Sequence, residues 1–224
     1  MKPYLIVLPV LALVVVAVLV MRQRSRSAVN EGGGVSVALQ TLEEKLAALA
    51  TCGITLRPEF SVDDLLSSWG RAQYEEPGFD MTLVGVGMTQ EEPPWTPRSD
   101  MLWHFDTECI EDHGSYVAIA TRLKELAGGS LPLTRIEDYV DLEEGEAWLS
   151  FEIGGKTTKI DCQVDDDWVD AAVFAPFVRL LADYDPSKIF LYYNLGGQDC
   201  IIGCLDKADY GKLRKLIPGV EPLQ

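Results

Sequence analysis

The sequence has few of the side chains that usually carry catalysis or bind metals. Its 224 residues include two histidines and five cysteines, and the cysteines show no tight framework spacing. An odd number of cysteines without such spacing is typical of reduced thiols in a reducing compartment. The sequence predicts no catalytic residue and no cofactor.

Two apparent binding motifs are incomplete. Gly85-Val-Gly87 would need a third glycine at position 90, which is Gln90, to match a dinucleotide fingerprint. The acidic run 165–170 lacks the alternating oxygen ligands and the central glycine of a calcium loop. We interpret this run as acidic residues that precede and favour the start of a helix.

Basic residues are scarce. The chain has 19 basic and 35 acidic residues, a formal net charge of −16. Without Lys2, Arg22, Arg24 and Arg26, 15 basic residues remain against the 35 acidic ones, a net charge near −20. Such a charge repels nucleic acid and favours a basic protein partner, although it also serves plain solubility.

Only one long hydrophobic run is present. Residues 4–21 are uncharged and rich in Leu and Val, which is long enough for a helix that crosses a bilayer. We predict a retained single-pass anchor in residues 1–22, a flexible tether in 23–34 and one soluble α+β domain in 35–224. Three arginines follow the span and only Lys2 precedes it, so the positive-inside rule places the domain in the cytoplasm, at the cell membrane.

Two hairpins dominate the C-terminal half. Residues 146–163 turn at Gly154-Gly155, which pairs Phe151 with Thr158 and Leu149 with Ile160 on an apolar face. The opposite face pairs Trp148 with Asp161 and is mostly polar.

The second hairpin, 188–205, turns at Gly196-Gly197 and is apolar on both faces, which predicts the middle of a sheet. Counting outward from the turn predicts that Tyr193 faces Cys200 and that Phe190 faces Gly203.

Helices are predicted from leucines at 39–49 ending at Gly53, from the Ser61 cap, across 116–126, up to Asp183 and across 206–217. Strands are predicted at 79–88 and 100–107. The chain then reads as about three ββα units with helices packed on a mainly antiparallel sheet, an α+β fold.

The densest group of candidate metal ligands is His104, Asp106 and Glu108, with His113 close in sequence. The first three share one face of a strand, and two imidazoles with carboxylates suit a divalent transition metal. The alternative is a polar strand face whose last residues cap the next helix. A further hypothesis is that Cys109 is a thiol nucleophile. The alternative is that Cys109 is a buried structural cysteine.

These observations predict a membrane-anchored, acidic cytoplasmic domain that works by binding. The alternative is a metal-dependent enzyme or sensor that uses His104, Asp106, Glu108 and His113.

Overall fold

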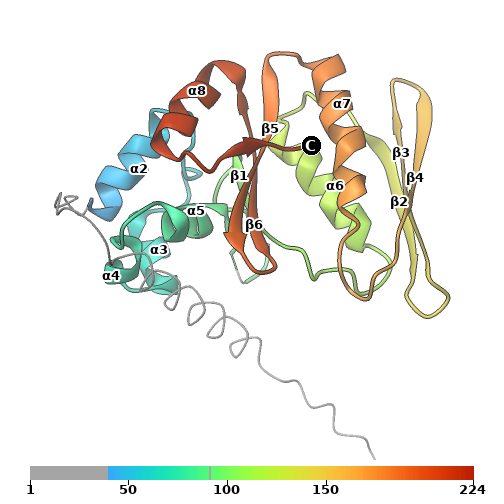
Figure 1. The fold of residues 1–224 in the computed structure, drawn as a ribbon, viewed down its shortest axis with the longest axis horizontal. Coiled ribbons are helices and arrows are strands. Elements are labelled where there is room, and N and C mark those ends of the chain that lie inside the picture. Colours follow the sequence, from blue (N-terminus) through green and yellow to red (C-terminus); the bar gives the residue numbers. More distant parts are fainter. Residues whose placement is uncertain (1–39, 91) are drawn as a thin grey trace, which may run out of the picture. The chain divides into compact units, whose positions relative to one another are not determined.

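The computed structural model describes residues 40–90 and 92–224, and these form a mixed α+β fold with two antiparallel sheets (Figure 1). The predicted α+β class with antiparallel strands is therefore confirmed. The predicted membrane span 4–21 and tether 23–34 lie outside the described residues. Within the described ranges, no helix has both the length and the apolar character needed to cross a bilayer.

The elements follow one another as helices, a strand, a helix, a three-stranded meander and a final hairpin flanked by helices. In chain order they are α2 (Leu42–Ala50), α3 (Val62–Ser68), α4 (Arg71–Tyr74), α5 (Asp80–Gly87), β1 (Leu102–Asp106), α6 (Ser115–Leu126), β2 (Thr134–Asp141), β3 (Glu146–Ile153), β4 (Lys156–Cys162), η1 (Ala171–Val173), α7 (Phe174–Tyr184), β5 (Lys188–Gly196), β6 (Asp199–Asp206), α8 (Lys207–Leu216) and β7 (Glu221–Pro222).

The larger sheet has the strand order β1-β6-β5-β7, so the final hairpin lies in its middle, as predicted. Its predicted register is wrong by one residue: Tyr193 lies opposite Ile201 and not Cys200. The cause is an irregularity between Asn194 and Gly196, where the Asn194 side chain accepts a hydrogen bond from the Gly196 N–H at 2.7 Å. Such a bulge inserts one extra residue into a strand and shifts every pair beyond it.

The predicted pairing of Phe190 with Gly203 is wrong for the same reason. Gly203 lies between Leu191 of β5 and Leu102 of β1, while Phe190 lies opposite Cys204. A Cβ atom at Gly203 would lie 2.9 Å from Leu102 Cδ2, so a larger residue there would overpack the sheet.

The smaller sheet has the order β2-β3-β4. Its β3–β4 register is the predicted one, with Phe151 opposite Thr158, Leu149 opposite Ile160 and Trp148 opposite Asp161. Strand β2 was not predicted, because a shift in register within it interrupts the regular alternation that marks a strand.

The strand predicted at 79–88 is wrong, since Asp80–Gly87 is helix α5. Six consecutive residues of α5 are buried, and a short run that is apolar on all sides does not distinguish a helix from a strand. Its glycines permit close packing: a Cβ atom at Gly87 would lie 2.7 Å from the backbone nitrogen of His104 on β1. The first of the three predicted ββα units is consequently a helix–strand–helix unit.

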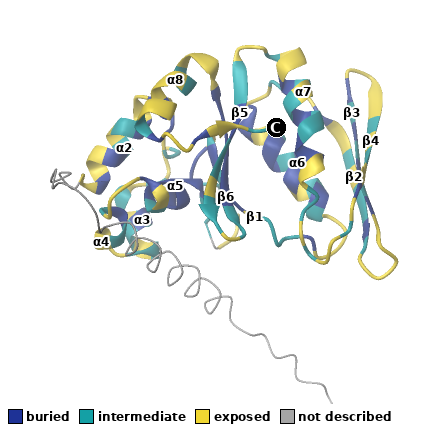
Figure 2. Cartoon of the chain, in the orientation of Figure 1, coloured by how far each residue is buried: buried dark blue, intermediate teal, exposed yellow. Residues whose placement is uncertain are grey.

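Layers of helices and sheets alternate in this part of the chain (Figure 1). One core joins α2, α5 and α8 to one face of the larger sheet, and the main core holds α6 and α7 between the larger and the smaller sheet. Figure 2 shows buried residues alternating with less buried ones along β3. Among the described elements, none covers the outer face of the smaller sheet.

Candidate functional site

The structure places the predicted metal ligands in two separate places. His104 lies on β1 with Nε2 3.2 Å from Asp199 Oδ1, across the strand pair, and Asp106 lies opposite Asp199. His113 lies instead against β2, where its ring centroid is 5.0 Å from that of Tyr139.

The Asp106 carboxylate accepts hydrogen bonds from the backbone N–H of Glu108 at 2.9 Å and from Gln198 Nε2 at 3.2 Å. In residues 40–90 and 92–224 no three His, Cys, Asp or Glu side chains are grouped so that they could hold a metal ion. The structure thus joins His104 to Asp199, a neighbour that the sequence did not suggest, and separates it from His113.

The thiol of Cys109 has an environment unsuited to a nucleophile. Burial, the largest cause, together with the nearby carboxylates of Asp106, Asp167 and Glu111, raises its pKa to about 12. A reactive cysteine needs the opposite, an electropositive setting that favours the thiolate. We interpret Cys109 as a structural residue.

Asp170, the last residue of the acidic run 165–170, caps the short helix η1 that precedes α7. Asp170 Oδ1 accepts the N–H of Ala172 at 2.9 Å and so caps η1, while its Oδ2 accepts the N–H of Gln163 at 2.8 Å. This arrangement agrees with the predicted role before a helix. Pro176 occupies the third position of α7, where it costs no helical hydrogen bond.

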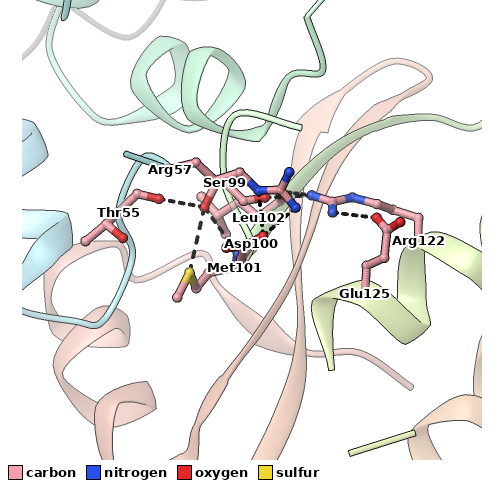
Figure 3. Close-up of polar contacts among 8 residues, drawn as sticks. All are labelled: Thr55, Arg57, Ser99, Asp100, Met101, Leu102, Arg122 and Glu125. Carbon is pink, nitrogen blue, oxygen red and sulfur yellow. Dashed lines mark hydrogen bonds and ion pairs between the residues drawn. The ribbon is translucent and has the colours of Figure 1, made fainter. Parts of the chain in front are cut away.

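A buried polar network surrounds the start of β1 (Figure 3). Arg122 of α6 donates through Nη2 to the carbonyl oxygens of Ser99 and Leu102, at 2.8 and 2.9 Å, and through Nη1 to Glu125 at 3.1 Å. Ser99 is fully buried and donates from Oγ to the carbonyl of Thr55 at 2.8 Å. These bonds satisfy main-chain carbonyls at the edge of the sheet, which is a structural role.

The surface with the clearest potential for recognition is the outer face of the smaller sheet. Tyr139 and Trp148 are paired across β2 and β3, and their rings stack with centroids 6.2 Å apart and planes 15° apart. His113 continues the row beyond Tyr139, and Lys159 Nζ lies 4.6 Å above the Trp148 ring on the β4 side. We call these four residues the aromatic row.

Local sequence explains why these side chains face outward. In β3 the even-numbered residues point away from the core and the odd-numbered ones, such as Leu149 and Phe151, are fully buried. Tyr139 follows from the same register in β2. The neighbouring Asp138 points inward and accepts hydrogen bonds from the N–H groups of Gly114 and Val117, which cap α6 and hold His113 beside the sheet.

Carboxylates surround the aromatic row. By strand register, the outward-facing acidic residues are Glu137, Asp141, Glu146, Glu152 and Asp161. Glu152 pairs with Arg135 at 2.7 Å and Asp161 lies 3.8 Å from Lys159, while no salt bridge involves the other three within the described chain. The negative field acts on the row itself, because the nearby carboxylate of Asp141 is the main cause that raises the pKa of Tyr139.

The pairing of Trp148 with Asp161 on a mostly polar face was predicted from the sequence, whereas the row was not. The missing information was β2, which supplies Tyr139, and the packing of α6, which supplies His113. The acidic residues and Trp of the β3–β4 hairpin were the available signal.

Searches against protein-family models, curated proteins and solved structures find no match to this chain.

Proposed function

We propose that this domain is a recognition module that binds a basic segment of a protein partner on the outer face of the smaller sheet. The observation that carries the proposal is the aromatic row, which lies among carboxylates on a sheet face that no described element covers. As part of the same proposal, residues 4–21 anchor the module at the cytoplasmic side of the cell membrane.

Cation–π attraction gives the row its chemical preference. An Arg or Lys side chain over a Trp or Tyr ring gains about 0.5–1 kcal/mol at an exposed site and more when water is excluded. In the structure Lys159 occupies such a position above Trp148, and a basic side chain of the ligand would take its place over the ring. The unpaired carboxylates nearby would pair with further basic groups of the ligand and steer its approach.

The second support is the charge of the whole chain. A formal net charge of −16 speeds encounter with basic partners and repels acidic ones, and this effect weakens as salt screens it. The same field opposes nucleic acid as the natural ligand.

Calorimetric titration of the full-length protein tests the proposal, with a soluble arginine–serine repeat peptide as the ligand and a glutamate–serine repeat as its counterpart. We expect only the arginine peptide to bind. Trp148→Ala should weaken binding about twofold to fivefold, the equivalent of losing one exposed cation–π contact. Asp141→Asn should weaken binding and reduce its dependence on salt.

Trp168→Ala provides the matched control, because Trp168 is also exposed, at 40%, but lies in the loop before α7, outside the row. Equal losses in Trp148→Ala and Trp168→Ala would show that binding is non-specific attraction to an acidic protein. If the folded wild-type protein does not bind the arginine peptide at low salt, the proposed function is refuted.

A further inference from the structure

Helix α8 concentrates positive charge in an acidic domain. It contains Lys207, Lys212, Arg214 and Lys215, four of the fifteen basic residues that follow the predicted anchor region, within ten positions. Asp209 is its one acidic residue. Among the described residues only Lys212 of the four forms a salt bridge, with Asp209 at 2.6 Å.

All four basic side chains belong to the solvent-facing side of α8. At 3.6 residues per turn they span an arc of about 160°, opposite the buried Leu213. The other exposed positions of this arc are Ala208 and Gly211, which are too small to keep a flat surface at a distance. We call this side the basic face of α8.

The basic face lies on the same side of the larger sheet as the C-terminal end of helix α2, whereas α2 begins beside α4, where the Leu42 N–H donates to Glu75. Helix α2, the first described helix, packs next to α8: Leu49 and Cys52 share a core with Leu213, and a Cβ atom at Gly53 would lie 3.4 Å from Asp209 Oδ2. Figure 1 shows α2 and α8 together, with the larger sheet and then α6 and α7 between them and the smaller sheet.

We propose that the basic face of α8 docks on the anionic lipid surface of the membrane that holds the predicted anchor. Juxtamembrane basic clusters are attracted to the anionic lipids of the cytoplasmic leaflet, and each Lys or Arg near that surface strengthens binding roughly fivefold. Charge complementarity carries the proposal, because four exposed cations face outward on this one helix. The aromatic row then lies at the far end of the domain, turned toward the cytoplasm.

Docking through α8 would also keep so acidic a domain close to an acidic membrane. Net charge governs interactions at long range, but at physiological salt the screening length is about 8 Å. A surface that contacts α8 therefore experiences mainly the local positive charge of this helix. The acidic groups on the smaller sheet lie beyond the intervening layers and are screened.

Lysine footprinting of the full-length protein in proteoliposomes tests the docking. One set of vesicles contains phosphatidylcholine alone, and the other also contains about a third phosphatidylserine. Modification by an acetylating reagent is read at each lysine by mass spectrometry. We expect Lys207, Lys212 and Lys215 to be protected only in the anionic vesicles, and to lose that protection at high salt.

Lys156 and Lys159 of the β3–β4 hairpin are internal controls and should stay equally reactive in both lipids. Neutralising two charges with R214Q and K215Q should weaken the affinity of α8 for the anionic surface roughly 25-fold. Those substitutions are solvent-exposed and should leave the melting temperature unchanged, whereas the matched change K156Q should leave the protection of α8 intact.

Equal labelling of α8 in the two kinds of vesicle would overturn the proposal, as would protection of the hairpin lysines in place of those of α8. Protection by a short RNA, but not by phosphatidylserine, would assign the basic face to nucleic acid and would equally overturn it. None of these results depends on whether the aromatic row binds a basic peptide.

Discussion

At the scale of single residues, one buried arginine, Arg122, stabilises the junction between α6 and the start of β1. The Arg122 side chain is only 8% exposed. Its guanidinium donates hydrogen bonds to the carbonyl oxygens of Ser99 and Leu102. Burial is the main cause that lowers the Arg122 pKa, which shows the cost of placing the charge there. This cost is offset only while the hydrogen bonds hold.

We therefore predict that Arg122→Ala lowers the free energy of unfolding by on the order of 3 kcal/mol, because it leaves the carbonyls of Ser99 and Leu102 buried and unpaired. Arg57→Ala is the matched control from the same network. It removes an ion pair with Asp100, whose side chain is 57% exposed, and should cost less than about 1 kcal/mol. Urea unfolding of both variants gives the comparison, and similar losses would contradict the assigned role.

At the scale of elements, glycines decide how closely helices approach the sheets. Gly87 of α5 allows the helix to contact the backbone of β1, whereas Gly211 of α8 faces open space. The two glycines are otherwise comparable, since both lie in helices and neither requires a positive φ. They differ in burial and in what a side chain would meet, since Gly87 is buried and Gly211 is exposed.

Gly87→Ala should accordingly destabilise the protein by about 1–3 kcal/mol, since the new Cβ would meet the His104 backbone at 2.7 Å and α5 would have to shift. Gly211→Ala should stabilise it by up to about 1 kcal/mol through helix propensity alone. Thermal unfolding followed by circular dichroism measures both. A tolerated Gly87→Ala would mean that α5 does not pack on β1 as described.

Elements with local signals were predictable from the sequence, whereas those set by packing were not. The Gly-Gly turn fixed the β3–β4 register, and the caps at Ser61 and Gly53 marked helix ends. Helix α5 was mistaken for a strand because uniform burial removes the periodic signal. The bulge at Asn194 depends on a side-chain hydrogen bond that no spacing rule reveals.

The candidate site shows the same division. Trp148 was placed on the outer face correctly, because its register follows from the turn. Tyr139 and His113 reach it through β2 and through the cap that Asp138 provides for α6, which are tertiary features. The predicted grouping of His104 with His113 rested on closeness in sequence alone.

At the scale of the whole molecule, the five cysteines lie in or beside the two large cores. Cys52 lies in the core beneath α8, and Cys162, Cys200 and Cys204 lie in the main core between the sheets. Cys109, the fifth, is partly buried beside that core. Protection of these thiols in intact cells would therefore report burial and not the side of the membrane on which the domain lies.

We predict that the native protein reacts negligibly with a maleimide at pH 8 and that all five thiols react in denaturant. Burial, the largest cause in each case, raises the pKa values of Cys109, Cys200 and Cys204 to about 12 and that of Cys162 to about 11. At pH 8 a thiol with a pKa near 12 is roughly one part in ten thousand thiolate, the reactive form. Mass spectrometry of the labelled protein counts the modified residues.

The same shifts predict how stability depends on alkaline pH. A folded-state pKa raised above the unfolded value of about 9 favours the folded protein below pH 9, and this contribution is lost as the pH rises through 11 to 12. Urea midpoints should therefore fall progressively above pH 9. Cys200→Ala should make that decline shallower, because one buried thiol no longer ionises on unfolding, although it also lowers stability at pH 7 through lost packing. Equal declines in the wild type and Cys200→Ala, or rapid labelling of the native protein at pH 8, would show that these thiols are not held in the cores.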